Sequence, residues 1–308
     1  GLVAASMPTG SFSKTVDALS KIARADNWEA RHGALSGLKY VLAARSAQGV
    51  CIPDDVAAVV LAVALHGLED GMEDVRSVSA ECLVPCVDQF WGDKLQGVRA
   101  NPDATAQIRR VVEQLWDSLL SLDPLNTGTR SAARLLQSIF QQYDSIKGDF
   151  PIEMDKVPRL WYQFTSKSAP TRRAALECYR SIGSNYAAST TKGPADDSMM
   201  NHYYCGIFSL LQVVVTDDKL ENAELARETA LLLLDHLGAS AAWTDYAAKH
   251  GVSNALFEGA MFDVQKVFSR PAMAKLPQEG VFEELSDETL ETPAVCVSKD
   301  LATRRRSL

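Results

Sequence analysis

The sequence predicts an all-α fold: a HEAT-repeat α-solenoid of about five to six antiparallel helix pairs. Apolar residues recur at three- and four-residue steps along most of the chain, which is the spacing of one helical face, and no strand hairpins are recognisable. A helix-start pattern carrying an early arginine recurs at Arg31, Arg76 and Arg172, which are 45 and 96 residues apart. Helix pairs that repeat every 40–47 residues or so are typical of HEAT and armadillo proteins. Such pairs bury their apolar faces by stacking on one another.

The clearest single unit lies at residues 56–86. Its first half is an apolar helical face at 56–68, and an acidic turn at 69–74 leads into a second amphipathic helix. Two helices joined by so short a turn pack antiparallel. Asp74 stands where a helix N-cap is expected, and Pro85 is expected to kink the second helix because it removes one backbone hydrogen bond.

Similar pairs precede and follow this unit. A first pair of helices is expected at 13–25 and 28–44, and a second pair at 53–91, with the acidic turn between its two helices. A third pair is expected to pack a helix at 107–121 against an apolar face at 132–140, and a fourth pair is expected at 157–166 and 171–184. A fifth pair is expected to bring Tyr204, Ile207, Phe208, Leu211 and Val215 against Leu225, Leu232, Leu233 and Leu237. A less regular sixth pair is expected at 239–268.

The repeats are expected to occupy residues 12–275, with loops near 92–106 and 185–199. The first eleven residues are expected to form a flexible start, and residues 276–308 a disordered tail. The chain starts with Gly rather than Met, so we expect it to be a piece of a longer protein.

The composition argues against some classes of function. The chain has 308 residues, 46% of them hydrophobic and 23% charged, which is ordinary for a globular protein. Its formal net charge of −8 argues against broad nucleic-acid binding, which needs a basic surface. No apolar run is long enough to span a bilayer, and the start does not have the pattern of a signal peptide.

The positions of the cysteines predict that they pack in the core rather than bind a metal. Three of the six, Cys82, Cys86 and Cys178, fall on apolar helix faces, where a free thiol behaves as a small hydrophobic group in a reducing compartment. Cys82 and Cys86 have no second Cys or His pair at ligand spacing nearby. We therefore expect no metal and no cofactor.

Several stretches, in one order, resemble a known family. They are Trp28-Glu29-Ala30-Arg31-His32-Gly33, Glu73-Asp74-Val75-Arg76 through Pro85, Leu115-Trp116 through Asp123, and Pro158-Arg159-Leu160-Trp161 with Arg172 through Glu177. These residues, within about 26–180, resemble the TATA-binding-protein-associated factors, the Swi/Snf-type ATPases also called B-TFIID subunit or modifier of transcription. The resemblance fades beyond about residue 240.

The resemblance implies a HEAT-repeat domain that clasps the TATA-binding protein through the turns between helices, on a basic convex face of the partner. It also implies a nuclear protein whose ATPase lies outside this chain, because no Gly-x-x-x-x-Gly-Lys-Ser/Thr phosphate loop is present. We expect a monomer. The expected partner-binding residues lie in three turns and are Glu69, Asp70, Glu73, Asp123, Leu125, Asn126, Asp217 and Asp218.

Other interpretations stay open. The acidic turn suits helix capping as well as partner recognition. The repeated arginines are expected to pair with turn aspartates such as Asp26 or Asp74 rather than with phosphate. The tryptophans at 28, 116 and 161 are expected in the core. A generic HEAT adaptor for another partner is one alternative function, and an enzyme that uses His32 or the Cys82 and Cys86 pair is another.

Overall fold

The computed structural model describes residues 9–91, 102–121, 127–142, 153–190 and 197–238, together with positions 244, 248 and 249. Every regular element in these ranges is helical. The chain divides into two compact units, Gly1–Asn185 and Tyr186–Leu308. The predicted all-α solenoid is confirmed, and none of the described helices is long and apolar enough to cross a membrane.

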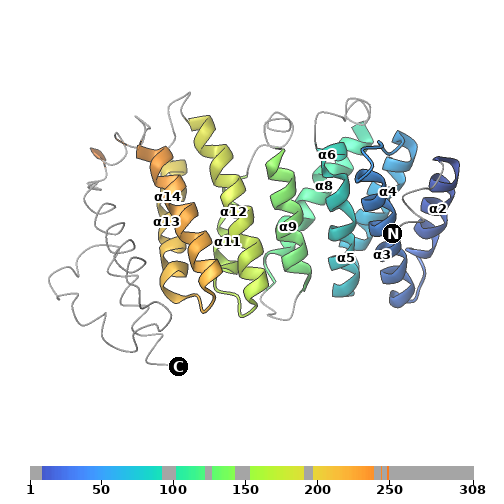
Figure 1. Ribbon diagram of the computed structural model, residues 1–308, viewed down its shortest axis with the longest axis horizontal. Coiled ribbons are helices and arrows are strands. Elements are labelled where there is room, and N and C mark those ends of the chain that lie inside the picture. Colours follow the sequence, from blue (N-terminus) through green and yellow to red (C-terminus); the bar gives the residue numbers. More distant parts are fainter. Residues whose placement is uncertain are drawn as a thin grey trace. The chain divides into compact units, whose positions relative to one another are not determined.

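The first unit holds four helix pairs. They are α2 (Thr9–Ile22) with α3 (Trp28–Ser46), α4 (Asp54–Leu68) with α5 (Glu73–Leu83), α8 (Pro102–Ser118) with α9 (Thr127–Gln141), and α11 (Pro158–Gln163) with α12 (Ala169–Thr190) (Figure 1). In the first three pairs the partner helices pack directly on each other. In the fourth pair, the rings of Trp161 and Phe164 meet the ring of Tyr179 edge to face.

The pairs stack in two layers. First helices contact first helices, α2 to α4 to α8, and second helices contact second helices, α3 to α5 to α9. The fourth pair continues both layers. The Arg159 guanidinium pairs with the Asp117 carboxylate of α8 at 2.7 Å, and the Asn185 amide of α12 donates to the carbonyl oxygen of Phe140 in α9.

The core lies between the two layers and matches the predicted apolar faces. Val56, Leu61, Val75 and Cys82 are buried, and so is Trp116 of α8. Complete burial of a leucine or valine side chain stabilises a fold by about 1.5–3 kcal/mol. Trp28 and Trp161 are only half-buried, so the expectation that all three tryptophans lie in the core holds fully for Trp116 alone.

The break predicted at Pro85 is confirmed. The helix α5 ends at Leu83, a 3-10 turn covers Val84–Cys86, and a short helix, α6, continues from Val87 to Phe90. Proline has no backbone N–H to donate, and its ring clashes with the preceding turn of a regular helix.

Helices reach into both segments that were expected to be loops. The helix α8 begins at Pro102, inside 92–106, because proline is well suited to the first helical position, where no N–H is needed. The helix α12 continues to Thr190, inside 185–199, and α13 begins at Asp197. The expected flexible start up to residue 8, most of the sixth pair and the tail after 276 lie outside the described residues.

The second unit contains α13 (Asp197–Thr216) packed on α14 (Leu220–Gly238). Ile207 and Leu233 are buried as expected, but Val215 is exposed, while three alanines of α14 lie in the core. The buried hydrophobic residues described in this pair are Tyr203, Ile207, Leu210, Val213, Val214, Ala223, Ala226, Ala230 and Leu233. The prediction was partly wrong because α13 is apolar on nearly all sides, which leaves its buried face ambiguous from periodicity alone.

Candidate functional site

In three of the helix pairs, an arginine of the second helix fixes the turn that joins the two helices. Arg31, Arg76 and Arg172 are each the fourth residue of the second helix, and each donates Nη1 to the two carbonyl oxygens five and six residues before it, at 2.7–3.4 Å. We call this contact the turn clamp. The expected pairing with a turn aspartate is confirmed for Arg31, whose partner is Asp70 of the next helix pair. It is not seen with the two aspartates named as examples: Asp26 contributes its backbone carbonyl, and Arg76 bonds carbonyls of its own turn.

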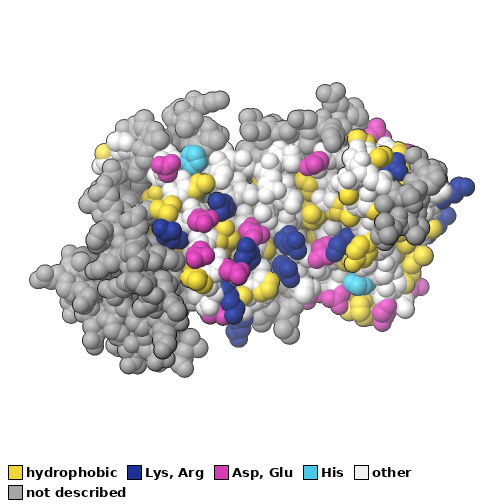
Figure 2. Space-filling view, viewed as in Figure 1, with side chains coloured by type: hydrophobic (Ala, Val, Ile, Leu, Met, Phe, Trp, Pro, Cys, Tyr) yellow, Lys and Arg dark blue, Asp and Glu magenta, His cyan; other side chains and the backbone are white. Residues whose placement is uncertain are grey.

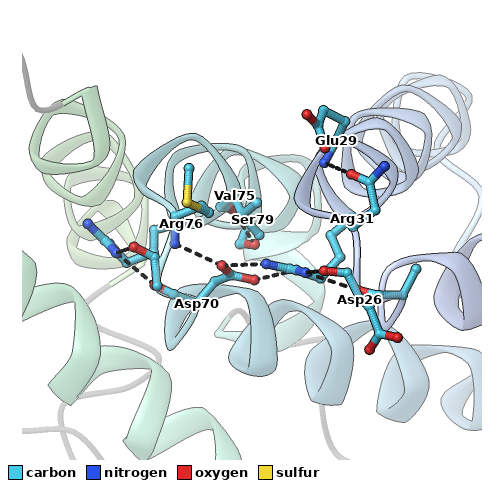
Figure 3. Close-up of polar contacts among 11 residues, drawn as sticks. Asp26, Glu29, Arg31, Asp70, Val75, Arg76 and Ser79 are labelled. Atoms are coloured by element: carbon cyan, nitrogen blue, oxygen red, sulfur yellow. Dashed lines mark hydrogen bonds and ion pairs between the residues drawn. The ribbon is translucent and has the colours of Figure 1, made fainter.

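Asp70 joins the first pair to the second (Figure 3). Its carboxylate accepts hydrogen bonds from Arg31, with Nε at 2.6 Å and Nη2 at 3.0 Å, and from the backbone N–H of Met72 at 2.8 Å. The side chain is only 6% exposed. Burial by itself would raise the pKa of Asp70, but the bonds from Arg31 and Met72 outweigh it and hold the pKa below its ordinary value. Asp70 is therefore engaged inside the repeat stack.

The other two acidic residues predicted in this turn also contact the next pair. Glu73 accepts hydrogen bonds from the backbone N–H groups of Thr127 and Gly128 at the start of α9. Glu69 pairs with Arg110 of α8 at 2.6 Å, in an arrangement open to solvent. Capping and recognition were both possible for this turn, and the structure shows the capping role for Glu73 directly.

The N-cap predicted at Asp74 is wrong. The N-cap position of α5 is Met72, which makes no side-chain cap bond, and the amide of Met72 is satisfied by Asp70 instead. Asp74 lies in the first turn of the helix and is exposed, where its negative charge favours the positive end of the helix dipole. It is thus an available carboxylate at this turn.

The turn of the second unit resembles that of the α4–α5 pair. Asp217 accepts the backbone N–H of Lys219 at 2.8 Å and the side-chain amide of Asn222 at 3.2 Å. Asp218 is exposed and lies 3.6 Å from the Lys219 ammonium. Asp123, Leu125 and Asn126, also predicted as partner contacts, lie outside the described residues.

Large apolar side chains are exposed beside the turns, and sequence reasoning missed them. In the first unit, Ile22, Met72, Leu120 and Tyr162 are 41–56% exposed, one near each of the four turns. We call these four residues the turn tips. Leu120 fits the apolar stripe read for a helix at 107–121, but α8 ends at Ser118, and Leu120 therefore leaves the buried face. Exposed apolar groups that recur at corresponding places are candidates for protein contacts.

The buried cysteines are poor nucleophiles. Burial raises the pKa of Cys82 to about 12 and raises the pKa values of Cys86 and Cys178 as well, so their thiols stay protonated at neutral pH. His32 packs edge-on against Trp28, with ring centroids 6.5 Å apart. Within the described ranges, no three His, Cys, Asp or Glu side chains are grouped to hold a metal.

Known proteins share parts of this sequence. The chain is 35% identical over 181 residues to TATA-binding protein-associated factor 172 of Homo sapiens, and 34% identical over 131 residues to TATA-binding protein-associated factor BTAF1 of Arabidopsis thaliana. These matches cover 58% and 42% of this chain but only 9% and 6% of the two relatives. The Saccharomyces cerevisiae factor MOT1 is 26% identical over 220 residues, which are 68% of this chain and 11% of that protein.

The resemblance inferred from the sequence is confirmed by these relatives, of which the chain spans about a tenth or less. No protein-family model matches the chain. Among solved structures, an engineered protein aligns with a TM-score of 0.53 at 15% identity, over 82% of this chain and 95% of that one. At so low an identity the likeness supports the fold alone.

Proposed function

We propose that this chain is a non-enzymatic protein-binding scaffold, a segment of a nuclear transcription regulator, and that it binds the TATA-binding protein through the turns between its paired helices. The observation that carries the proposal is the 35% identity over 181 residues to a protein named for its association with the TATA-binding protein. We propose that the chain acts as a monomer.

Rigid turns suit this function. The turn clamps hold three turns by backbone hydrogen bonds, and a surface that is already ordered loses little conformational entropy when a partner binds. The turn tips then supply apolar groups that can enter shallow pockets of a partner. Interfaces gain most of their affinity from a few such buried anchors.

Exposed acidic side chains add charge to the turns. In the first unit these are Asp74, two residues after Met72, and Asp117, whose carboxylate pairs with Arg159. In the second unit, Asp218 is exposed in the turn of its own helix pair. They can face the basic partner surface that the family resemblance implies, and charge pairs at the edge of an interface chiefly speed association. The carboxylates of Asp70 and Glu73 are engaged within the stack, so changing them would confuse lost stability with lost binding.

The test is a binding measurement with purified TATA-binding protein. Calorimetry on the double variant Met72→Ser/Leu120→Ser should show affinity at least about tenfold weaker than for the unchanged chain, since two apolar anchors are removed. Both side chains are exposed, so the helical circular-dichroism signal should not change. The matched control is Val50→Ser/Val84→Ser, which alters two exposed apolar residues away from these turns and should change affinity less than about twofold.

The outcomes separate the alternatives. If the unchanged chain shows no binding at a concentration of about 100 μM, its affinity is too weak for specific recognition. The proposal then fails, and a generic adaptor for another partner is favoured. Binding that both double variants retain equally would place the contact surface away from the turn tips.

A further inference from the structure

The third helix pair also carries an arginine at the position of the turn clamp, but the turn before it, residues 122–126, lies outside the described residues. Arg130 is the fourth residue of α9, the position that Arg31, Arg76 and Arg172 occupy in their helices. Its side chain is nevertheless exposed, and it makes no hydrogen bond or ion pair in the part of the chain that the structure describes. At this helix start, Glu73 of the preceding pair caps the backbone N–H groups of Thr127 and Gly128. The helix start is held by a carboxylate, and the Arg130 side chain is exposed.

A second free arginine lies one helical turn further on. Arg134 is also exposed, and its guanidinium likewise has no bonded partner among the described residues. Residues four apart on a helix are neighbours, and two like charges in this arrangement destabilise the helix slightly. No acidic residue occurs within α9 to offset them. The pair is therefore a local concentration of positive charge on a chain whose net charge is −8.

The carboxylates on the flanking helices are already engaged. Glu81 of α5 pairs with Lys39 and accepts a hydrogen bond from Ser131 Oγ at 3.2 Å. Burial alone would raise the pKa of Glu81, but these contacts and the nearby positive charge of Arg134 hold it below its ordinary value, so the side chain stays ionised and bonded. On α12, Glu177 pairs with Arg173 at 2.9 Å. Neither carboxylate forms a hydrogen bond or ion pair with Arg130 or Arg134 among the described residues, although the charge of Arg134 acts on Glu81 from a distance.

We propose that the exposed face of α9, defined by Arg130 and Arg134, binds an acidic segment of a partner protein through side-chain carboxylates. Guanidinium groups bind carboxylates in a two-point, fork-like geometry, which gives direction as well as charge. The Lys and Arg side chains grouped in Figure 2 over the position of α9 in Figure 1 show that this face is open to solvent. The proposal is independent of TATA-binding-protein recognition at the turns.

The charge pattern favours an acidic peptide over a nucleic acid. The helices on either side of α9 carry both signs of charge, in the Lys39–Glu81 pair and in the Arg173–Glu177 pair. Nucleic-acid binding surfaces need a continuous basic track that neutralises several successive phosphates, and here Glu81 and Glu177 interrupt it. A peptide with a few spaced carboxylates can pair with the arginines while avoiding Glu81 and Glu177.

The experiment uses the whole chain and a fluorescein-labelled peptide of about twelve residues, half of them glutamate. Fluorescence anisotropy at low salt should show binding that Arg130→Ala/Arg134→Ala weakens about tenfold, the combined loss expected for two exposed charge contacts. The control Lys21→Ala/Arg24→Ala removes two other exposed positive charges from the chain and should change the affinity less than about twofold. Arg130→Lys/Arg134→Lys should give an intermediate affinity, because lysine keeps the charge and loses the fork.

Any of three results would overturn the proposal. The first is equal binding of the peptide in which glutamine replaces every glutamate. The second is binding of a DNA duplex that depends on Arg130 and Arg134 while the acidic peptide does not bind. The third is an equal loss in the Lys21 and Arg24 control, since overall charge would then explain the effect.

Discussion

Single residues decide whether each turn is held from inside or is free to meet a partner. Arg31 binds the backbone of its own turn and the carboxylate of Asp70 in the next, so one side chain orders two turns. Arginine can do this because its fork carries several donors in fixed directions, which a lysine ammonium does not. The repeated arginine is therefore a structural residue in the three turns where the clamp is described, whereas the side chain of Arg130, at the same helix position, is exposed.

The ion pair of Asp70 predicts a specific pH dependence. The folded-state pKa of Asp70 is lowered, so its stabilising contribution is present above the unfolded value of about 4 and is lost as pH falls through the folded value. Asp70→Asn should therefore lower the melting temperature at pH 7, and the difference from the unchanged chain should shrink as the pH falls below the unfolded value of about 4. Thermal melts from pH 7 to pH 2.5 measure it. Asp74→Asn, which alters an exposed carboxylate nearby, is the control.

Trp116 predicts the largest effect of a single residue on stability. Its side chain is buried, and its ring lies 6.0 Å from the ring of Phe140 across the α8–α9 pair. Trp116→Ala should lower the free energy of unfolding by about 3–5 kcal/mol, because the cavity adds to the lost apolar burial. Chemical denaturation measures the loss, and the exposed Tyr162→Ala should cost less than about 1 kcal/mol. A comparable loss in both variants would contradict the core assignment.

At the scale of helices and turns, carboxylates of one pair support the next. Glu73 caps the start of α9, Asp70 receives Arg31, and Glu81 connects Lys39 with Ser131. In a stack where each pair contacts only its neighbours, such contacts set the register between pairs while the apolar faces supply most of the stability. An acidic turn of this kind is thus part of the connection between repeats.

The cap supplied by Glu73 can be tested directly. Glu73→Ala should lower the free energy of unfolding by about 0.5–2 kcal/mol, the range for loss of a helix cap, because the Thr127 and Gly128 amides lose their acceptor. Glu73→Gln keeps an oxygen acceptor and should lose less. Chemical denaturation of the three proteins provides the comparison. An alanine variant as stable as the unchanged chain would show that solvent satisfies these amides equally well.

Periodicity predicted the helices well and their long-range polar partners poorly. The apolar faces of α4, α5 and α8 could be read directly, because each has a single apolar stripe, and Pro85 marked the helix break. The partner of Arg31 could not be predicted from the sequence, since Asp70 is 39 residues away and comes close to Arg31 only because of how two helix pairs stack. The turn tips were missed for a related reason: their exposure depends on where each helix ends, to within one or two residues.

At the scale of the whole molecule, the net charge of −8 and the apolar turn tips act on different steps of binding. An acidic scaffold attracts a basic partner over distances of about a Debye length, and this attraction weakens as salt is added. The tips make contact only after docking, when they are removed from water. If the chain binds the TATA-binding protein through its turns, charge should control the association rate and apolar contact the dissociation rate.

This separation can be measured by stopped-flow or surface-plasmon kinetics. Raising the salt concentration from about 50 to about 300 mM should slow association severalfold while changing dissociation less than about twofold, as expected for electrostatic steering. Met72→Ser/Leu120→Ser should do the opposite, leaving association nearly unchanged and speeding dissociation about tenfold. The exposed acids Asp74 and Asp218 can be tested in the same assay, and their change to asparagine should reproduce part of the effect of salt on association. If salt instead accelerated dissociation and the apolar variant did not, the interface would consist of charge pairs, and the turn tips would lie outside it.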